Sequence, residues 1–202
     1  FGGVSLAHNG NLTNAQKLKK KLIESGAIFQ STSDTEVILH LLSTTKGNIV
    51  DRIIYSLKSI SGAYALLLMT EDTLIGIRDP YGIRPLVIGK LGESYVFSSE
   101  SCGLDIIGAE LIRDVEPGEI ILIKKNQIES IKPFKNTQLR PCLFEYIYFS
   151  RPDSILEGRS VYDVRKRIGY ELAKENINDK SNIDVVIPIP DSGNASALGF
   201  SE

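Results

Sequence analysis

Apolar residues recur every three or four positions in three stretches near the start of the chain. Residues 13–25 place apolar side chains on one face and lysines on the other, and the glycine that follows is typical of a helix end. A Ser-x-x-Glu capping box at residues 33–36 predicts the start of a second helix. Ile49, Ile53 and Leu57 are spaced four apart, as in a third. The pattern therefore predicts three amphipathic helices in this part of the chain.

Short β-rich runs surround these helices. Residues 4–8 form a plausible buried strand before the first helix, and after residue 62 such runs follow one another between turn signals such as Asp79-Pro80-Tyr81-Gly82. The predicted strands of this second group are residues 63–70, 73–78, 86–89, 95–98 and 120–125. Helices followed by a run of strands predict an α+β layer architecture.

The pattern changes again near residue 133. Residues 133–141 are polar, contain two prolines and show no periodicity, so we interpret them as a boundary between two domains. Beyond it, apolar spacing predicts a helix over residues 161–175 and a buried strand over residues 184–189. A strand, a turn at residues 190–193 and a helix start are typical of the opening of an α/β unit.

Composition excludes several classes of protein. Hydrophobic residues make up 42% and charged residues 24% of the 202, and the net charge is −2, which leaves no basic surface for nucleic acid or an acidic membrane. The apolar runs are far shorter than the roughly 20 residues that span a bilayer. Two cysteines cannot make a disulfide framework, so a reducing, cytoplasmic location is expected. Since Met69 is the only methionine and Phe1 already begins a strand-like run, we expect an internal fragment of a longer protein.

Asn9 and Gly10 admit two interpretations. Both residues tolerate positive φ, so a tight turn after the first strand is the simpler one. Alternatively, an Asn side-chain NH₂ and a glycine N–H can converge on one oxygen as an oxyanion hole. The two remain open from the residues alone.

Asp34 and the turn at residues 190–193 are equally ambiguous. At a helix start, Asp34 can simply complement the helix dipole, or it can hold a substrate ammonium group. Ser192 lies in a turn at the carboxyl end of a predicted strand, where ligands of α/β sheets bind, although an ordinary Asx turn fits as well. His8 and His40 stand isolated in the sequence, which favours packing or hydrogen bonding over catalysis.

Cys102 and Cys142 give no site by their spacing. They lie 40 residues apart, form no Cys-x-x-Cys pair and have no activating neighbour in sequence. The residues alone therefore indicate only two α/β-type units of a small-molecule enzyme.

Taken together, the motifs resemble a known family. AHNGNL at residues 7–12 and STSDTE at residues 31–36 resemble the glutaminase domain of N-terminal-nucleophile amidotransferases, and glucosamine-6-phosphate synthase shares this pair. The later motifs are more selective and resemble the amidophosphoribosyltransferases. They are DPYGIRPL at residues 79–86, SSESC at 98–102, DVEPG at 114–118, FEYIYFSRPDS at 144–154 and VIPIPDSG at 186–193.

This resemblance implies a fold and a division of the chain. Residues 1–132 are expected to be the C-terminal part of a class II glutamine amidotransferase domain, an incomplete four-layer αββα N-terminal-nucleophile hydrolase fold. Residues 133–141 are expected to be a linker. Residues 142–202 are expected to open an α/β phosphoribosyltransferase domain.

The resemblance also implies an activity. In that family an amino-terminal cysteine hydrolyses glutamine, and the ammonia reacts with phosphoribosyl pyrophosphate to give 5-phosphoribosylamine and pyrophosphate, the first committed step of purine synthesis. Asn9 and Gly10 match the oxyanion-hole pair, and Asp34 matches a residue that binds the α-ammonium group of glutamine. Ser192 matches a position near the magnesium and phosphoribosyl pyrophosphate site. Cys142 matches a cysteine that ligates a 4Fe–4S cluster in some members, whereas others keep the cysteine without a cluster.

By the same resemblance, the partners are glutamine, phosphoribosyl pyrophosphate, Mg²⁺, purine nucleotides as feedback inhibitors, and further copies of the chain in a homo-oligomer. The nucleophilic cysteine and the arginine for the glutamine carboxylate are expected upstream of Phe1, and the remaining transferase motifs downstream of Glu202. The chain alone is therefore expected to be inactive.

Two alternatives remain. One is a hexosamine-forming amidotransferase, which residues 145–154 and 188–193 disfavour because they suit a phosphoribosyltransferase neighbour. The other is a catalytically inactive regulatory paralogue. A cysteine directly after the start methionine or a short propeptide in the upstream gene sequence would distinguish the enzyme from the paralogue.

Overall fold

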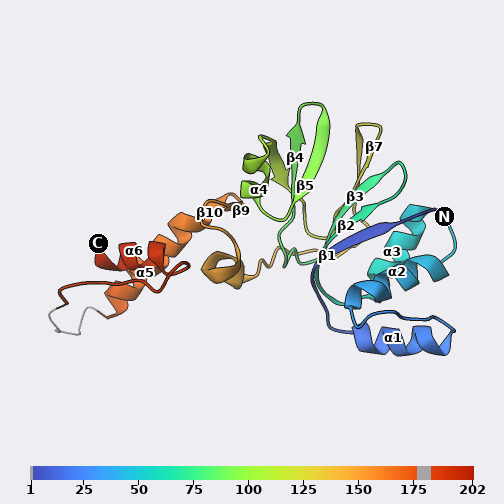
Figure 1. Ribbon diagram of the computed structural model, residues 1–202, viewed down its shortest axis with the longest axis horizontal. Helices are drawn as coiled ribbons and strands as arrows, with labels where there is room; N and C mark the ends of the chain where they lie inside the picture. Colours follow the sequence, from blue (N-terminus) through green and yellow to red (C-terminus); the bar gives the residue numbers. More distant parts are fainter. Residues whose placement is uncertain (1, 177–182) are drawn as a thin grey trace.

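Two antiparallel sheets dominate the first part of the molecule, in a computed structural model that describes residues 2–176 and 183–202 (Figure 1). The five-stranded sheet has the order β1-β2-β3-β7-β8, with β1 (Ser5–Leu12), β2 (Gly62–Met69), β3 (Leu74–Arg78), β7 (Ile120–Lys124) and β8 (Gln127–Ile131). The three-stranded sheet has the order β5-β4-β6, with β4 (Val87–Leu91), β5 (Ser94–Ser98) and β6 (Glu110–Asp114).

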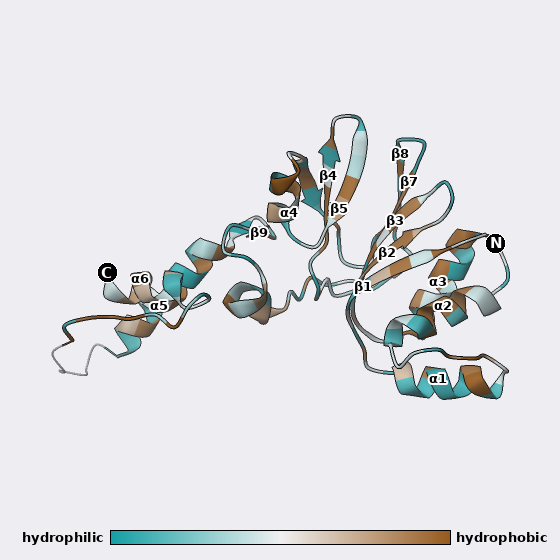
Figure 2. Cartoon of the chain, in the orientation of Figure 1, coloured by the Kyte–Doolittle hydropathy of each residue, from teal (hydrophilic) through white to brown (hydrophobic). Residues whose placement is uncertain are grey.

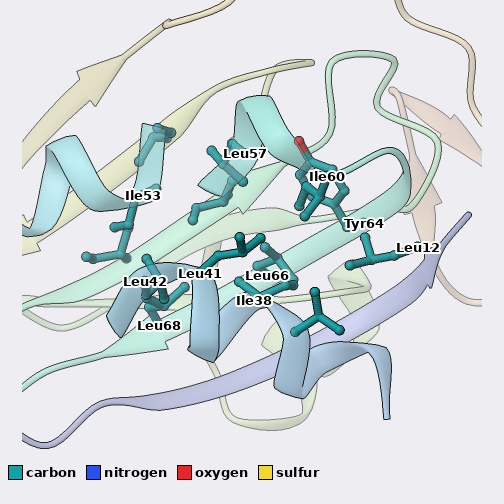
Figure 3. Packing of buried hydrophobic residues seen from close by; sticks show 14 of the residues in the cluster. Leu12, Ile38, Leu41, Leu42, Ile53, Leu57, Ile60, Tyr64, Leu66 and Leu68 are labelled. Carbon is teal, nitrogen blue, oxygen red and sulfur yellow. The ribbon is translucent and has the colours of Figure 1, made fainter. Parts of the chain in front are cut away.

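Three helices accompany the larger sheet: α1 (Ala15–Glu24), α2 (Asp34–Thr44) and α3 (Ile49–Ser59). They confirm the three helices that the apolar spacing predicts. Their apolar faces pack with one face of the sheet in a single cluster, which we call the helix-side core (Figure 3). Its most buried members include Ile38, Leu42, Ile53, Leu66 and Ile77.

The central strands are apolar on both faces because both faces are covered. On β2, Leu66 belongs to the helix-side core while Ala65 packs with Ile88 and Phe97 of the smaller sheet. Gly76 permits this contact, since a Cβ there would lie 2.4 Å from the Phe97 ring. A further short helix, α4 (Ser101–Ile106), joins a small cluster with β4. The mixed helix and sheet content confirms the α+β prediction.

The second predicted helix begins where expected, but its cap differs. Ser33 accepts a hydrogen bond from the Thr35 N–H, whereas Glu36 accepts from the Ser31 N–H and not from Ser33. The predicted capping box at residues 33–36 is therefore wrong, because Ser31 occupies the glutamate. A true capping box forms at Asn48 and Asp51 at the start of α3.

The second part of the chain is mainly helical (Figure 1). A short π-helix, η1 (Glu145–Phe149), precedes the two-stranded ribbon β9 (Ile155–Leu156) and β10 (Arg159–Ser160). Helix α5 (Val161–Glu175) lies where the sequence predicts it, and α6 (Asn194–Ser201) packs closely on it. A Cβ on Gly169 would lie 1.8 Å from the Ser196 carbonyl oxygen, so this crossing needs glycine.

The predicted buried strand at residues 184–189 is wrong. This stretch has no regular structure, and Val185, Ile187 and Ile189 are 69%, 79% and 85% exposed. Figure 2 shows how hydrophobic the stretch is. Within the described ranges no strand pairs with it, and an isolated strand cannot satisfy its backbone hydrogen bonds. The turn and the helix start that follow form as predicted.

Residues 133–141, predicted as a linker, lie against the turn at residues 79–82. The N–H groups of Gln138, Arg140 and Cys142 donate to the carbonyls of Pro80, Tyr81 and Ile83 at 3.1, 2.7 and 3.1 Å. Among the residues described, no helix is long and apolar enough to cross a membrane.

Candidate functional site

Asn9 and Gly10 lie inside β1, so the turn interpretation of this pair is wrong. They face Ala65 and Tyr64 of β2 in an antiparallel register. Gly10 has a φ of 146°, and a Cβ there would lie 2.1 Å from the Ala63 carbonyl oxygen. Glycine therefore lets the strand continue through a position that a side chain would close.

The N–H of Gly10 points away from β2. Thr13 donates its N–H to the Ser61 carbonyl on the β2 side, whereas Leu12 donates its N–H to Asp34 Oδ2 at 2.8 Å on the other side. Because N–H groups two residues apart in a strand point the same way, the N–H of Gly10 shares the edge with that of Leu12. β1 is the outer strand of its sheet, so this edge carries both a backbone donor and a carboxylate.

Asp34 is the first residue of α2, directly after the Ser33 cap. One of its oxygens bonds the Leu12 N–H, and the side chain stays 23% exposed. The positive end of the helix dipole lies at this position, where a negative charge is favourable. A partly open carboxylate fixed beside a strand edge can accept a hydrogen bond from a ligand's ammonium group.

His8 lies beside Asp34, a contact that the sequence around His8 did not indicate. Its Nδ1 is 3.2 Å from Thr35 Oγ1 and 3.6 Å from Asp34 Oδ1. Burial lowers the pKa of His8 below its usual value, although the charge of Asp34 opposes this. A neutral imidazole is therefore favoured. It fills the contact between β1 and α2 and adds no charge to that of Asp34 at the edge.

The Asn9 side chain is held by an arginine. Arg84 Nε and Nη2 donate to Asn9 Oδ1 at 3.0 and 2.7 Å, and Asn9 Nδ2 lies 3.5 Å from Ser99 Oγ. Arg84 Nη1 lies 2.9 Å from Oε1 of Glu145, which is buried in η1. The ring of Phe149 lies 5.1 Å from the guanidinium.

The loop that carries Arg84 is itself fixed by buried charges. The Asp79 carboxylate accepts hydrogen bonds from the N–H groups of Tyr81 and Ile83 at 2.8 and 3.0 Å, and burial raises the pKa of Asp79 above its usual value. Arg78 donates to the Arg84 carbonyl at 2.9 Å and to Glu157 at 2.7 Å. We call Arg78, Arg84, Glu145 and Glu157 the polar junction, because it ties residues 78–84 to the second part of the chain.

Ser192 and Cys142 belong to the second part of the chain. Ser192 is in the turn before α6, and Cys142 follows residues 133–141, with its N–H bonded to the Ile83 carbonyl. The described residues contain no group of three or more His, Cys, Asp or Glu side chains that could hold a metal. Each residue thus offers at most one ligand, and the two cysteines of this chain do not by themselves supply the four that a cluster needs.

Arg84 and Glu145 are the residues that sequence reasoning missed. A signal was present for both, because each is a charged residue within an apolar stretch, in IRPL at residues 83–86 and in FEYIYF at residues 144–149. Charges in such stretches are seldom buried without a partner. The signal indicates burial but not that these two residues meet.

Comparison with known proteins identifies the first part of the chain. Residues 1–105 match a family described as a glutamine amidotransferase domain. Over its whole length the chain is 49%, 45% and 46% identical to the amidophosphoribosyltransferases of Rhizobium etli, Bacillus subtilis and Methanocaldococcus jannaschii. It covers only 41%, 42% and 46% of these proteins, so it spans less than half of their length.

Solved structures agree with the sequence relatives. Glutamine phosphoribosylpyrophosphate amidotransferase from Bacillus subtilis, in complex with ADP and GMP, matches 99% of the chain with a TM-score of 0.94 and 44% identity. A structure described as the allosteric regulatory enzyme of purine biosynthesis matches 99% with a TM-score of 0.95 and 45% identity. The chain covers 44% and 43% of these two proteins.

Proposed function

Because this chain belongs to the glutamine amidotransferase domain family, we propose that it is part of an enzyme that transfers the amide nitrogen of glutamine to phosphoribosyl pyrophosphate. The products are 5-phosphoribosylamine, glutamate and pyrophosphate. The observation that carries the proposal is the outer edge of β1, where the Asp34 carboxylate accepts the Leu12 N–H and the Gly10 N–H points to the same edge, with Asn9 next to Gly10 in the strand. The identity with amidophosphoribosyltransferases over the full chain supports the acceptor.

We assign the roles at this edge from the charges that glutamine hydrolysis creates. Attack of a thiolate on the amide carbon turns the carbonyl oxygen into an oxyanion, and two N–H donors from Asn9 and Gly10 stabilise it. The ionised Asp34 accepts a hydrogen bond from the α-ammonium group and fixes the substrate at the helix start. These donors and this carboxylate do not take part in the second half-reaction.

Neither cysteine of this chain suits the nucleophile. Cys102 is buried in α4, which keeps its Sγ out of reach of a substrate. Cys142 donates its N–H to the carbonyl of Ile83, in the loop that carries Arg84. We therefore assign the thiolate to a cysteine outside this chain.

Several finer features belong to the same proposal. We assign residues 1–132 to a four-layer N-terminal-nucleophile hydrolase domain and residues 142–202 to the start of a phosphoribosyltransferase domain. On the basis of the family resemblance, we also propose Mg²⁺ near Ser192 and an iron–sulfur cluster at Cys142. The same resemblance supports a homo-oligomer and a cytoplasmic location. Regulation by purine nucleotides has the support of the relative solved with ADP and GMP.

The test separates the two nitrogen sources in the full-length enzyme. Asp34→Asn keeps the size of the side chain but removes the charge that pairs with the α-ammonium group, which ammonia lacks. Losing this charge-assisted hydrogen bond should cost roughly 2–4 kcal/mol, or about 30- to 1000-fold in the glutamine-dependent rate. Formation of phosphoribosylamine from ammonia should stay near that of the unsubstituted enzyme.

A matched control comes from another helix start. Asp51 lies in the first turn of α3 and is exposed, so Asp51→Asn should leave both nitrogen sources unchanged. Equal loss of both rates in Asp34→Asn would contradict the proposal and assign Asp34 to the fold. An unsubstituted enzyme without glutamine hydrolysis would support the inactive paralogue instead.

A further inference from the structure

The orientation of the Asn9 amide is decided by its neighbour. An Asn side chain presents an acceptor on one side and two donors on the other, and only the donor side can stabilise an oxyanion. The Arg84 guanidinium carries donors alone, so the side of Asn9 that faces it must be Oδ1. Two converging hydrogen bonds of 3.0 and 2.7 Å thus hold Nδ2 on the opposite side.

Arg84 is in turn fixed on several sides. Its Nη1 pairs with Glu145 Oε1 at 2.9 Å, and the other oxygen of Glu145 accepts from Ser150 Oγ at 2.8 Å. Its backbone carbonyl accepts the Nε–H of Arg78, whose side chain is 1% exposed. Neither the backbone nor the guanidinium of Arg84 is therefore free to turn away from Asn9.

We propose that Arg84 is a positioning residue for glutamine hydrolysis, which keeps the Asn9 amide turned with Nδ2 toward the oxyanion, and that Glu145 holds Arg84 in this state. The inference rests on the proposed function. It places part of the support of the glutaminase site at residues 145–150, beyond the matched amidotransferase region of residues 1–105. The second part of the chain would then control the orientation of an oxyanion donor in the first.

The physical reason is the cost of a flipped amide. Without Arg84, rotation about the last side-chain bond of Asn9 exchanges Oδ1 and Nδ2, and an acceptor then faces the developing negative charge. Substrate binding through Asp34 does not depend on this rotation. Loss of Arg84 should thus lower kcat and leave KM for glutamine nearly unchanged, because the missing interaction exists only in the transition state.

The experiment compares Arg84→Met with Asn9→Ala and with the double variant in the full-length enzyme. Loss of a whole oxyanion donor costs about 100- to 1000-fold in kcat, so Arg84→Met, which only disorders the donor, should cost about 10- to 100-fold. Ammonia-dependent synthesis should not change. In the Asn9→Ala background, Arg84→Met should cause no further loss, because its effect passes through Asn9.

Three further variants distinguish a positioning role of Arg84 from a general effect on folding. Arg84→Lys should recover kcat only in part, because one ammonium cannot reproduce the two-pronged contact. Glu145→Gln, which keeps the shape of η1, should lower kcat about 3- to 10-fold in the same non-additive way if Arg84→Met does not fold. Arg140→Met is the matched control, because Arg140 also stacks on an aromatic ring of this loop, 5.4 Å from that of Tyr81, but its guanidinium donates to Gln138 and not to Asn9. It should leave kcat unchanged.

The outcomes separate the inference from the function beneath it. If the unsubstituted enzyme hydrolyses no glutamine, the proposed function fails and the inference with it. If glutamine hydrolysis is present but the losses of Asn9→Ala and Arg84→Met multiply, or if ammonia-dependent synthesis falls equally, Arg84 is structural and only the inference is overturned.

Discussion

The helix-side core and the polar junction are both buried, but they resist change in different ways. In the core, Leu66 and Ile77 pack within a cluster of apolar side chains, and such contacts have no preferred direction. In the junction, Arg78 donates from three nitrogens to three backbone carbonyls and to Glu157 at 2.7–2.9 Å. The core depends on volume, whereas the junction depends on the direction of each bond.

This difference explains the division of labour between the two regions. Apolar packing brings β1 and α2 together, which places Asp34 at the strand edge. The junction then orients single side chains through directed hydrogen bonds, as Arg84 does for Asn9. Conservative substitutions should therefore be tolerated in the core and not in the junction.

The largest expected effect is in the junction. Arg78→Met should lower the free energy of unfolding of the 202-residue chain by about 3–5 kcal/mol, because removal of one partner leaves Glu157 and three buried carbonyls without their donor. Arg78→Lys should cost nearly as much, since a single ammonium cannot reach acceptors spread around a planar fork. Urea unfolding monitored by circular dichroism gives both values. A loss below 1 kcal/mol in Arg78→Lys would remove the distinction between the two regions.

The core should respond to lost volume and tolerate a change of shape. Leu66 has no exposed surface. Leu66→Ala should lower the free energy of unfolding by about 2–4 kcal/mol, because a cavity remains. Leu66→Met keeps the volume and should cost less than about 1.5 kcal/mol. The same urea titration measures both, and equal losses for Ala and Met would show that the core is as exacting as the junction.

Glu119 provides a third test, by pH. Two bonds from Arg113, at 2.7 and 2.8 Å, and one from Ser130 oppose its burial and lower the pKa of Glu119 to about 2, from a usual value near 4.5. A lowered pKa in the folded state adds stability above pH 4.5, which is lost as the pH falls toward 2. At pH 7 the free energy of unfolding of the unsubstituted chain should be about 2 kcal/mol higher than that of the Glu119→Gln variant.

This difference should shrink progressively between pH 4.5 and pH 2, measured by urea unfolding at several pH values. A difference that stays constant over this range would mean that the Glu119 carboxylate does not lose its bonds by protonation.

The sequence predicted most helices and central strands because their signals are local. The spacing of apolar residues in α3 and α5 is complete within one segment, and neither depends on a distant partner. Residues 184–189 show the opposite case, since a strand needs a neighbour that their own composition cannot supply. The short elements α4, β6 and β8 went unpredicted because their residues carry weak periodicity.

The candidate site was predictable only in part for the same reason. Asn9, Gly10 and Asp34 were predicted from two short motifs and their resemblance; the structure places Asn9 and Gly10 in β1 and bonds Asp34 of α2 to the edge of that strand. Arg84 meets Asn9 across 75 positions of sequence, and Glu145 meets Arg84 across a further 61. No local pattern specifies such a pairing, although an isolated charge in an apolar stretch indicates that some partner exists.

Residues 133–141 have a consequence for anyone who wishes to cut this molecule in two. Their prolines and polar composition suggest a natural place for a protease or a gene truncation. Yet Gln138 and Arg140 are tied by backbone bonds to the turn at residues 79–82. A protease can cleave residues 133–141 only after they detach from this turn. A truncation at residue 132 removes these backbone hydrogen bonds together with η1. A domain trimmed at its apparent linker would then be purified without Glu145, which pairs with the Arg84 guanidinium.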